Sequence, residues 1–363
     1  MASYMMKALL MLENGMTYEG IGFGDEHDVL CEVVFNSAMC GYTELLTDPS
    51  YAGQGVVMTY PIMGSYGICY EDAESTQPWL GAFIVHSLSK VASNFRSDTD
   101  LDSYLKANHI PGISGIDTRT LTKCLRESGT MRGMISYGDH INTADMKRQI
   151  DAFVFQSYVP VVSDKDSKVY GDGPIKIALA DYGVKHNIIR SLVNRGCTVK
   201  CFPQDASFED YMSFSPDGIM LSNGPGDPKD CTKAIAELKK VYAHGIPTFA
   251  ICLGHQLMAL ALGFDTYKLK YGHRGINHPV KDLSSNRVYI TSQNHGFVVN
   301  AETVNPSIAN ISFISMNDGS IEGLNYANGK VFSVQFHPEA SPGPLDTGFL
   351  FDKFINLIGG GQL

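Results

Sequence analysis

The second half of the chain alternates short apolar segments with segments of helical periodicity. Strand-like runs lie at 175–180 (IKIALA), 198–202 (TVKCF), 218–221 (GIML) and 248–251 (TFAI). Helix-like segments lie at 185–196, at about 229–244 after the pair Asp227-Pro228, and directly after residue 252. This rhythm is typical of βαβ units, in which helices cover both faces of a parallel sheet. We therefore expect an α/β fold with a mostly parallel central sheet here.

A polar segment, SDKDSKVYGDGP (163–174), separates this half from a region with a different pattern. That region has strand-like runs at 31–36 and 56–60, and one helix is predicted at 118–128, between Asp117 and Gly129. GIGFG (20–24) is predicted to be a turn, since charged residues rather than a helix follow it. A chain of 363 residues can fill two cores. We expect an N-terminal, β-rich mixed domain at 1–165 and a second domain at 175–363.

The charge and the cysteine pattern exclude several classes of protein. The net charge is −10 and no run of lysine or arginine occurs, which argues against nucleic acid as a ligand. Only a five-residue apolar run follows Lys7 before Glu13, which is too short for a signal peptide or a membrane span. The eight cysteines form no C-x-x-C pair, so a reducing compartment fits them best. We expect a cytoplasmic protein that does not bind membranes.

Three strand ends in the second domain carry residue types that suit one reaction. Cys252 follows the run TFAI and precedes a helix, the layout of a nucleophile elbow, although a thiol that merely packs in the core is the alternative. His337 and Glu339 follow the apolar run VFSV (331–334) and can supply the base and the carboxylate that a thiol nucleophile needs. The glycines of SNGPGDP (222–228) can bring backbone N–H groups against a substrate carbonyl.

These segments are expected to meet, because the carboxyl ends of parallel strands lie at one edge of a sheet. The helix that begins behind Cys252 favours the thiolate form of its side chain. Nucleophile, base, carboxylate and oxyanion donors together indicate acyl transfer rather than three unrelated loops.

The same segments resemble a known family. FAICLGHQ, SNGPGDP and FHPEASPGP are similar to the signature segments of class I (triad) glutamine amidotransferases, which release ammonia from the side chain of glutamine. Four further segments resemble the small, glutamine-hydrolysing subunits of carbamoyl-phosphate synthases: VVFNSAMCGYTELLTDPSY (33–51), GIDTRTLTKCLRESGTMRGMI (115–135), GHRGINHPV (272–280) and SQNHGFVV (292–299). The first two are the most discriminating, because other triad amidotransferases lack this N-terminal domain.

The resemblance implies a role for each matching residue. Cys252 would be the nucleophile, His337 the general base and acid, and Glu339 the group that orients the imidazole. The backbone N–H groups of Leu253 and Gly224 would form the oxyanion hole. The positions that would bind glutamine are Ser50, Gly224, Gly226, Leu253, Gln256, Asn294, Gly296 and Phe297. The N-terminal domain, which has no catalytic cluster of its own, would dock the partner.

The expected cofactors and partners follow from the same comparison. No G-x-x-x-x-G-K-[ST] loop occurs, so this chain is expected to hold no cofactor, and ATP chemistry must reside on another polypeptide. The resemblance implies a large synthetase subunit that uses Mg-ATP and bicarbonate, in arginine and pyrimidine synthesis. A metal is not expected, because no carboxylate or thiolate completes a recognised spacing with the histidines at 255, 273, 278 and 295.

Two other functions stay open at this point. One is a free-standing cysteine amidase or another triad amidotransferase that serves a different acceptor. The other is a catalytically silent scaffold that only binds a partner, against which the presence of Cys252, His337 and Glu339 argues.

Overall fold

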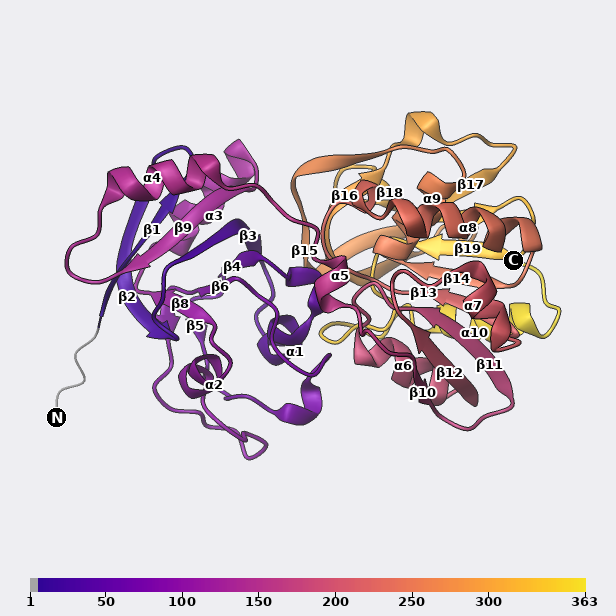
Figure 1. Cartoon of the computed structure of the whole chain (residues 1–363), viewed down its shortest axis with the longest axis horizontal. Helices are drawn as coiled ribbons and strands as arrows, with labels where there is room; N and C mark the ends of the chain where they lie inside the picture. Colours follow the sequence, from indigo (N-terminus) through magenta and orange to yellow (C-terminus); the bar gives the residue numbers. More distant parts are fainter. Residues whose placement is uncertain (1–5) are drawn as a thin grey trace. The chain divides into compact units, whose positions relative to one another are not determined.

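The computed structural model describes residues 6–363. The chain divides into two compact units, one reaching to Gln156 and the other spanning Ser157–Leu363. This division precedes the polar segment 163–174, part of which forms a strand, β10 (Lys168–Tyr170), in the sheet of the second unit (Figure 1). None of the helices in the described residues combines the length and the apolar character that a membrane span requires.

The first unit is built on a closed β-barrel. Around the barrel the strands follow the order β1 (Lys7–Leu12), β2 (Thr17–Gly24), β8 (Pro111–Ser114), β6 (Ala82–Ile84), β4 (Gln54–Met58), β3 (Val29–Asn36) and β9 (Met131–Tyr137). The pairs β3–β4, β4–β6 and β6–β8 are parallel, and the other pairs are antiparallel. Leu10, Val33 and Val57 are fully buried in one apolar core. The predicted β-rich, mixed character of this region is confirmed.

Strand β2 corrects one prediction, because GIGFG lies in this strand and not in a turn. A Cβ atom on Gly20 would lie 2.4 Å from the carbonyl oxygen of Ser114, and one on Gly22 would lie 2.8 Å from the ring of Tyr137. These glycines are therefore required by the close approach of a neighbouring strand and a ring.

The helices of the first unit are α1 (Tyr42–Thr47), α2 (Leu101–Ala107), α3 (Thr118–Ser128) and α4 (Thr143–Ala152). Helix α3 has the predicted bounds. The side chain of Asp117 accepts a hydrogen bond from the N–H of Thr120 at 2.9 Å, and Gly129 ends the helix with a φ of 99°. Leu121 and Leu125 are fully buried, so the apolar face of α3 packs on the core.

The second unit contains a ten-stranded sheet. Its order is β10, β12 (Cys197–Phe202), β11 (Ile175–Ala180), β13 (Gly218–Leu221), β14 (Thr248–Ile251), β19 (Val331–Val334), β18 (Ile321–Tyr326), β17 (Ala309–Ser315), β15 (Thr266–Asp282) and β16 (Val288–Val299). The central strands from β12 to β19 are parallel, as predicted. The strands from β18 to β16 extend the sheet in antiparallel fashion and end in a long hairpin that the strand–helix rhythm did not indicate.

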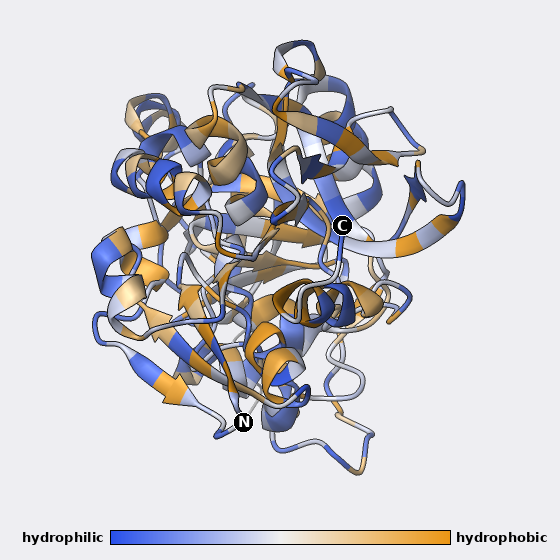
Figure 2. Ribbon diagram, turned by 90° about the vertical axis from the view of Figure 1, so that its right-hand side faces the viewer, coloured by the Kyte–Doolittle hydropathy of each residue, from blue (hydrophilic) through white to orange (hydrophobic). Residues whose placement is uncertain are grey.

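Helices cover both faces of this sheet. They are α5 (Val159–Val162), α6 (His186–Val193), α7 (Phe208–Ser213), α8 (Thr232–His244), α9 (Leu253–Ala261) and α10 (Phe349–Ile358). Side chains alternate along β14, where Ala250 joins the core under α8 and α9 while Phe249 and Ile251 join the core under α6 and α10. In Figure 2 the central strands are hydrophobic in colour and the helices carry both colours, as expected for a sheet between two helical layers.

Helix α8 begins later than predicted. The side chain of Asp227 does accept a hydrogen bond from the N–H of Lys229 at 2.9 Å, but it caps only a 3₁₀ turn, η3 (Pro228–Asp230). Cys231, with a φ of −85° and a ψ of 48°, then interrupts the helical backbone, and α8 starts at Thr232. The cap-and-proline signal therefore marked a preceding turn rather than the helix itself.

Candidate active site

Three adjacent strands direct their following segments to one edge of the sheet. Strands β13, β14 and β19 are neighbours and parallel. The segment 222–228, residue 252 and the segment 335–339 follow these strands directly. Because parallel strands share a carboxyl edge, the three segments predicted to act together emerge at the same place.

Cys252 occupies the corner between β14 and α9. Its φ of 52° and ψ of −105° are rarely adopted by a residue with a Cβ atom, and such a conformation costs about 1–3 kcal/mol. The N–H of Cys252 donates to the carbonyl oxygen of Val334 at 2.8 Å, which ties the corner to β19. The residue is only 2% exposed, and its thiol hydrogen-bonds to the carbonyl oxygen of Asn294 at 3.7 Å. A strained corner held by its neighbours is the geometry of a nucleophile elbow.

His337 and Glu339 form a close buried pair. Nδ1 of His337 lies 2.6 Å from Oε1 of Glu339, and both side chains are almost fully buried. The N–H of His337 donates to the carbonyl oxygen of Ser292 at 3.0 Å, which attaches this segment to β16. Since a carboxylate oxygen only accepts, Nδ1 carries a proton and Nε2 is the nitrogen left for chemistry.

Lys185 adds a positive charge that sequence reasoning missed. Its ammonium group lies 3.1 Å from Oε1 of Glu339, with the two side chains 3% and 0% exposed, and it also donates to the carbonyl oxygen of Ala340. Burial alone would raise the pKa of Glu339, but Lys185 and then His337 lower it to about 2. The sequence did contain an indication that Lys185 lies near the site, because this residue follows β11, a strand that is parallel to β13 and ends at the same edge of the sheet.

The imidazole of His337 links the carboxylate with the thiol. Burial alone would lower the pKa of His337, but Glu339 and then Cys252 raise it to about 10, chiefly through charge. Nε2 of His337 has no hydrogen-bond partner while the thiol hydrogen-bonds to Asn294. The charges around His337 therefore favour its protonated form, which can donate a proton from Nε2.

The glycine segment after β13 packs directly against the start of α9. A Cβ atom on Gly224 would lie 2.2 Å from the carbonyl oxygen of Tyr182 and 2.8 Å from Cδ2 of Leu253. The next glycine, Gly226, has a φ of 88°. The N–H of Gly254 donates to the carbonyl oxygen of Ser222 at 3.0 Å, which links the two segments. Gly224 and Leu253, predicted to share the oxyanion role, thus lie in contact.

Strand β16 lies beside this edge and carries three of the predicted glutamine-binding positions. Asn294 accepts the hydrogen bond of Cys252, and Gly296 and Phe297 follow on the same strand. Gln256 of α9 donates to the carbonyl oxygen of Phe297 at 2.7 Å and to Oε1 of Gln335 at 2.9 Å. The structure therefore brings these four positions together around one strand.

Ser50 is the one predicted site residue that belongs to the first unit. It lies in a 3₁₀ turn, η1 (Pro49–Tyr51), where its N–H donates to Oδ1 of Asp48 at 2.9 Å. Its contact with glutamine stays a prediction.

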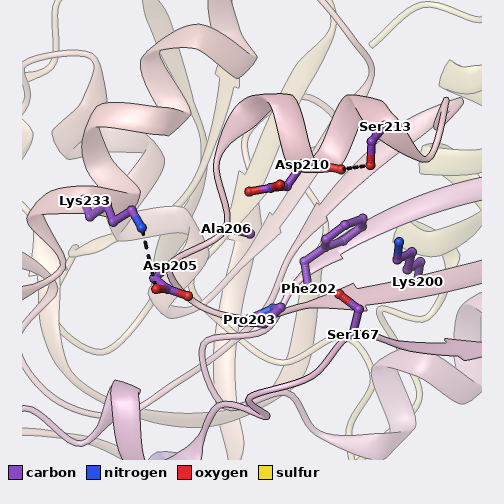
Figure 3. A pocket seen from close by; sticks show the side chains of 9 residues that line it. All are labelled: Ser167, Lys200, Phe202, Pro203, Asp205, Ala206, Asp210, Ser213 and Lys233. Atoms are coloured by element: carbon purple, nitrogen blue, oxygen red, sulfur yellow. Dashed lines mark hydrogen bonds and ion pairs between the residues drawn. The ribbon is translucent and has the colours of Figure 1, made fainter.

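A hollow elsewhere in the second unit has a different character. It has a volume of about 430 Å³ and lies beside β12, α7 and α8 (Figure 3). It is lined by Ser167, Lys200, Phe202, Pro203, Asp205, Ala206, Asp210, Ser213 and Lys233. The two lysines balance the two aspartates, and Lys233 faces Asp205 at 3.6 Å. None of the predicted site residues lines this hollow.

Two family models match the chain. Residues 178–357 match the model described as "Glutamine amidotransferase class-I", and residues 10–135 match "Carbamoyl-phosphate synthase small chain, CPSase domain". Each match falls within one of the two compact units. The site at Cys252 therefore lies in the part that matches the amidotransferase model.

Curated relatives are similar over nearly the whole chain. The carbamoyl phosphate synthase small chain of Clostridium perfringens is 50% identical over 351 residues, which cover 96% of this chain and 99% of that protein. The corresponding protein of Bacillus cereus is 47% identical over 356 residues (97% and 96%). That of Clostridium acetobutylicum is 45% identical over 354 residues (97% and 100%). The chain therefore belongs to the carbamoyl-phosphate synthase small-chain family and carries its class I glutamine amidotransferase domain.

Proposed function

We propose that this chain hydrolyses L-glutamine through Cys252, His337 and Glu339 and passes the ammonia to a large synthetase subunit. The observation that carries the proposal is the convergence of these side chains at the edge formed by β13, β14 and β19. The hydrogen bond of 2.6 Å between His337 and Glu339 and the charges around them support an imidazolium beside the thiol.

The first half of the reaction cleaves the amide of glutamine. The Cys252 sulfur attacks the side-chain amide carbon, and the carbonyl oxygen becomes an oxyanion that accepts hydrogen bonds from the N–H groups of Leu253 and Gly224. The His337 imidazolium gives its Nε2 proton to the amide nitrogen, the C–N bond breaks, and ammonia leaves. A glutamyl thioester on Cys252 remains, while Glu339 keeps the ring oriented.

The second half releases glutamate. His337, now neutral at Nε2, takes a proton from water while the water oxygen attacks the thioester carbon. The C–S bond breaks, and the thiolate–imidazolium pair forms again. In this proposal Gly226, Gln256, Asn294, Gly296 and Phe297, together with Ser50, hold the α-amino and α-carboxylate groups of glutamine.

The ammonia requires a partner that uses it directly. In water at neutral pH ammonia is mostly protonated and is then a poor nucleophile, so release into bulk solvent would waste it. The named relatives are small chains of carbamoyl phosphate synthase, which supports a large subunit that makes carbamoyl phosphate from bicarbonate and Mg-ATP. We expect this complex in the cytoplasm, in arginine and pyrimidine synthesis, with no cofactor on this chain.

The first unit is proposed to dock the large subunit. It matches the model of the small-chain CPSase domain, and the triad lies in the other unit. Cross-linking mass spectrometry of the complex checks this role. Cross-links to the large subunit should concentrate in residues up to 156, and their absence from this unit would contradict it.

Kinetics with and without the partner test the proposed function. Glutamine hydrolysis should be slow for the chain alone and should rise strongly when the large subunit, Mg-ATP and bicarbonate are added. The rate of glutamine hydrolysis by a free-standing cysteine amidase would not change on these additions, and a silent scaffold would show no hydrolysis under either condition.

A further inference from the structure

A second polar cluster lies within the antiparallel part of the sheet. His273 of β15, His295 of β16 and Glu322 of β18 each offer one atom to a common point, and these atoms lie within 4.8 Å of one another. The two histidines are 5% exposed and the glutamate is fully buried. The reaction proposed above uses none of the three side chains.

The hydrogen bonds of His295 leave a lone pair that faces another acceptor. Nδ1 lies 2.9 Å from the carbonyl oxygen of Phe297, which only accepts, so Nδ1 carries the proton. Nε2 lies 2.9 Å from Oε1 of Gln293. Flipping the side-chain amide of Gln293 would not remove this conflict without a cost, because its nitrogen donates a hydrogen bond to Oε2 of Glu322 at 2.9 Å.

His273 presents the same feature. Nε2 lies 2.8 Å from Oδ2 of Asp318, which assigns a proton to Nε2. Nδ1 lies 3.4 Å from Oε1 of Glu322, and neither atom has a hydrogen-bond partner. A proton on Nδ1 would satisfy this contact, and the two carboxylates do raise the pKa of His273 against the effect of its burial. A proton on Nδ1 of His273 would still leave Nε2 of His295 facing Oε1 of Gln293, with no hydrogen atom between these two acceptors.

We propose that Nδ1 of His273, Nε2 of His295 and Oε1 of Glu322 bind a divalent transition-metal ion, with zinc as the best fit. Two imidazoles and a carboxylate suit zinc, and ligand bonds of about 2.0–2.2 Å place tetrahedral ligands about 3.4 Å apart. The observed separations from Oε1 of Glu322 are 3.4 Å to His273 and 3.9 Å to His295. Oε1 of Gln293 or a water completes the coordination.

The surroundings of these atoms support a metal ion. Histidines that bind metals usually donate their other N–H to a carboxylate or a carbonyl oxygen. His273 does so to Asp318 and His295 to Phe297. The second oxygen of Glu322 accepts from Gln293. The metal was not expected from the sequence because the missing carboxylate, Glu322, lies on a strand far downstream of the histidines.

The proposed ion would fix the strand that holds the substrate. His295 stands between Asn294 and Gly296, so the ion would tie this part of β16 to β15 and β18. The effect on glutamine binding rests on the proposed function, whereas the binding of the metal itself does not. Metal content measured without glutamine therefore separates the two proposals.

The full-length chain, purified and dialysed against zinc and then against metal-free buffer, provides the test. We expect about one zinc ion per chain by mass spectrometry of the metal content. Glu322→Gln, which keeps the side-chain volume, and His273→Ala should each lower the retained zinc at least about tenfold. The exposed Glu209 supplies the matched control, Glu209→Gln, which should retain zinc like the wild type.

Cobalt(II) gives a second readout that does not depend on retention during dialysis. Cobalt added to the metal-free chain should produce the visible absorption of a tetrahedral site, and Glu322→Gln should abolish it while circular dichroism confirms that the variant is folded. A wild-type chain that retains no zinc and gives no cobalt spectrum would overturn the proposal. The cluster of His273, His295 and Glu322 would then be stabilised by protons rather than by a metal ion. Equal zinc retention by wild type and both variants would overturn it as well.

Discussion

The two buried polar clusters of the second unit balance their charges in different ways. At the Cys252 site, Lys185 and the imidazolium of His337 face the carboxylate of Glu339, so the protein supplies its own cations. In the cluster of His273, His295 and Glu322, acceptor atoms face one another, and a proton on His273 relieves only its contact with Glu322 and not the contact between His295 and Gln293. The comparison shows that a charge-balanced cluster can hold a reactive group, whereas an unbalanced one is suited to bind a cation.

The clusters also differ in their position on the sheet. The Cys252 site is made by segments that leave parallel strands, where side chains and backbone N–H groups can face a substrate. The histidine cluster lies on paired strands, with His273 directly opposite His295 in the β15–β16 register. In the proposed function the reacting groups therefore lie on loop ends, whereas the histidine cluster lies on paired strands.

Replacing a histidine in each cluster gives the largest expected contrast. His337→Asn removes the proposed general base and acid, and should lower kcat for glutamine hydrolysis by at least about 1,000-fold. His273→Asn should lower kcat by less than about tenfold and raise the KM for glutamine, because it loosens strand β16 without touching the thiol. Steady-state kinetics of both variants in the complex measure the contrast. Similar losses of kcat in both variants would erase the distinction between the clusters.

The backbone of the Cys252 site is expected to matter nearly as much as its side chains. Gly224→Ala places a methyl group where the carbonyl oxygen of Tyr182 lies and should displace the N–H from the oxyanion position, with a loss in kcat of about 100-fold. Gly359→Ala is the matched control, because Gly359, like Gly224, has no positive φ, and the added atom would lie no closer than 3.5 Å to its nearest neighbour, the carbonyl oxygen of Asn356. Kinetics of the two variants check this, and equal losses would remove the case for a specific role of Gly224.

Lys185 tests whether the Cys252 site depends on its own cation. Lys185→Met leaves the Glu339 carboxylate buried without this partner and should destabilise the unit by about 3–5 kcal/mol. Adding Glu339→Gln should recover part of that loss, because the uncompensated charge is gone. Urea unfolding of the two single variants and the double variant gives the coupling energy. Strictly additive losses in the free energy of unfolding would mean that the ion pair between Lys185 and Glu339, at 3.1 Å, does not contribute to stability.

The pH dependence of stability should show the smallest effect. The pKa of Glu339 falls from 4.5 to about 2, so its contribution is present above pH 4.5 and is lost as the pH falls toward 2. The pKa of His337 rises from 6.5 to about 10, so its contribution is present below pH 6.5 and is lost as the pH rises toward 10. The difference in melting temperature between wild type and the double variant His337→Gln/Glu339→Gln should peak between pH 4.5 and 6.5. A difference that is constant with pH would contradict these shifts.

The parts of the fold with regular local signals were predictable. Strands β11, β13 and β14 lie at the predicted residues. Each is a short, continuous apolar run between glycines and helix caps, and such a run is compatible with few structures other than a buried strand. Since parallel strands share a carboxyl edge, the approach of Cys252, His337 and Glu339 also followed from the order of the segments. The family resemblance added the positions on β16, which no periodicity indicates.

The rest depended on pairing between distant strands. Glu322 reaches His273 only through the order β18, β17, β15, β16, which depends on register rather than on local pattern. Gly20 and Gly22 read as a turn because the strand and ring that require them lie far away in sequence. Lys185 was missed because a lysine at the start of a helix is usually exposed, whereas here it faces a buried carboxylate.

Cys252→Ser in the complex with the large subunit tests the central claim most directly. Carbamoyl phosphate synthesis is measured with glutamine and, separately, with added ammonia as the nitrogen source. We predict that the variant loses glutamine-dependent synthesis and keeps the ammonia-dependent rate of the wild type. Glutamine-dependent synthesis that continues without the Cys252 thiol would contradict the claim that this corner of the sheet is where ammonia is released.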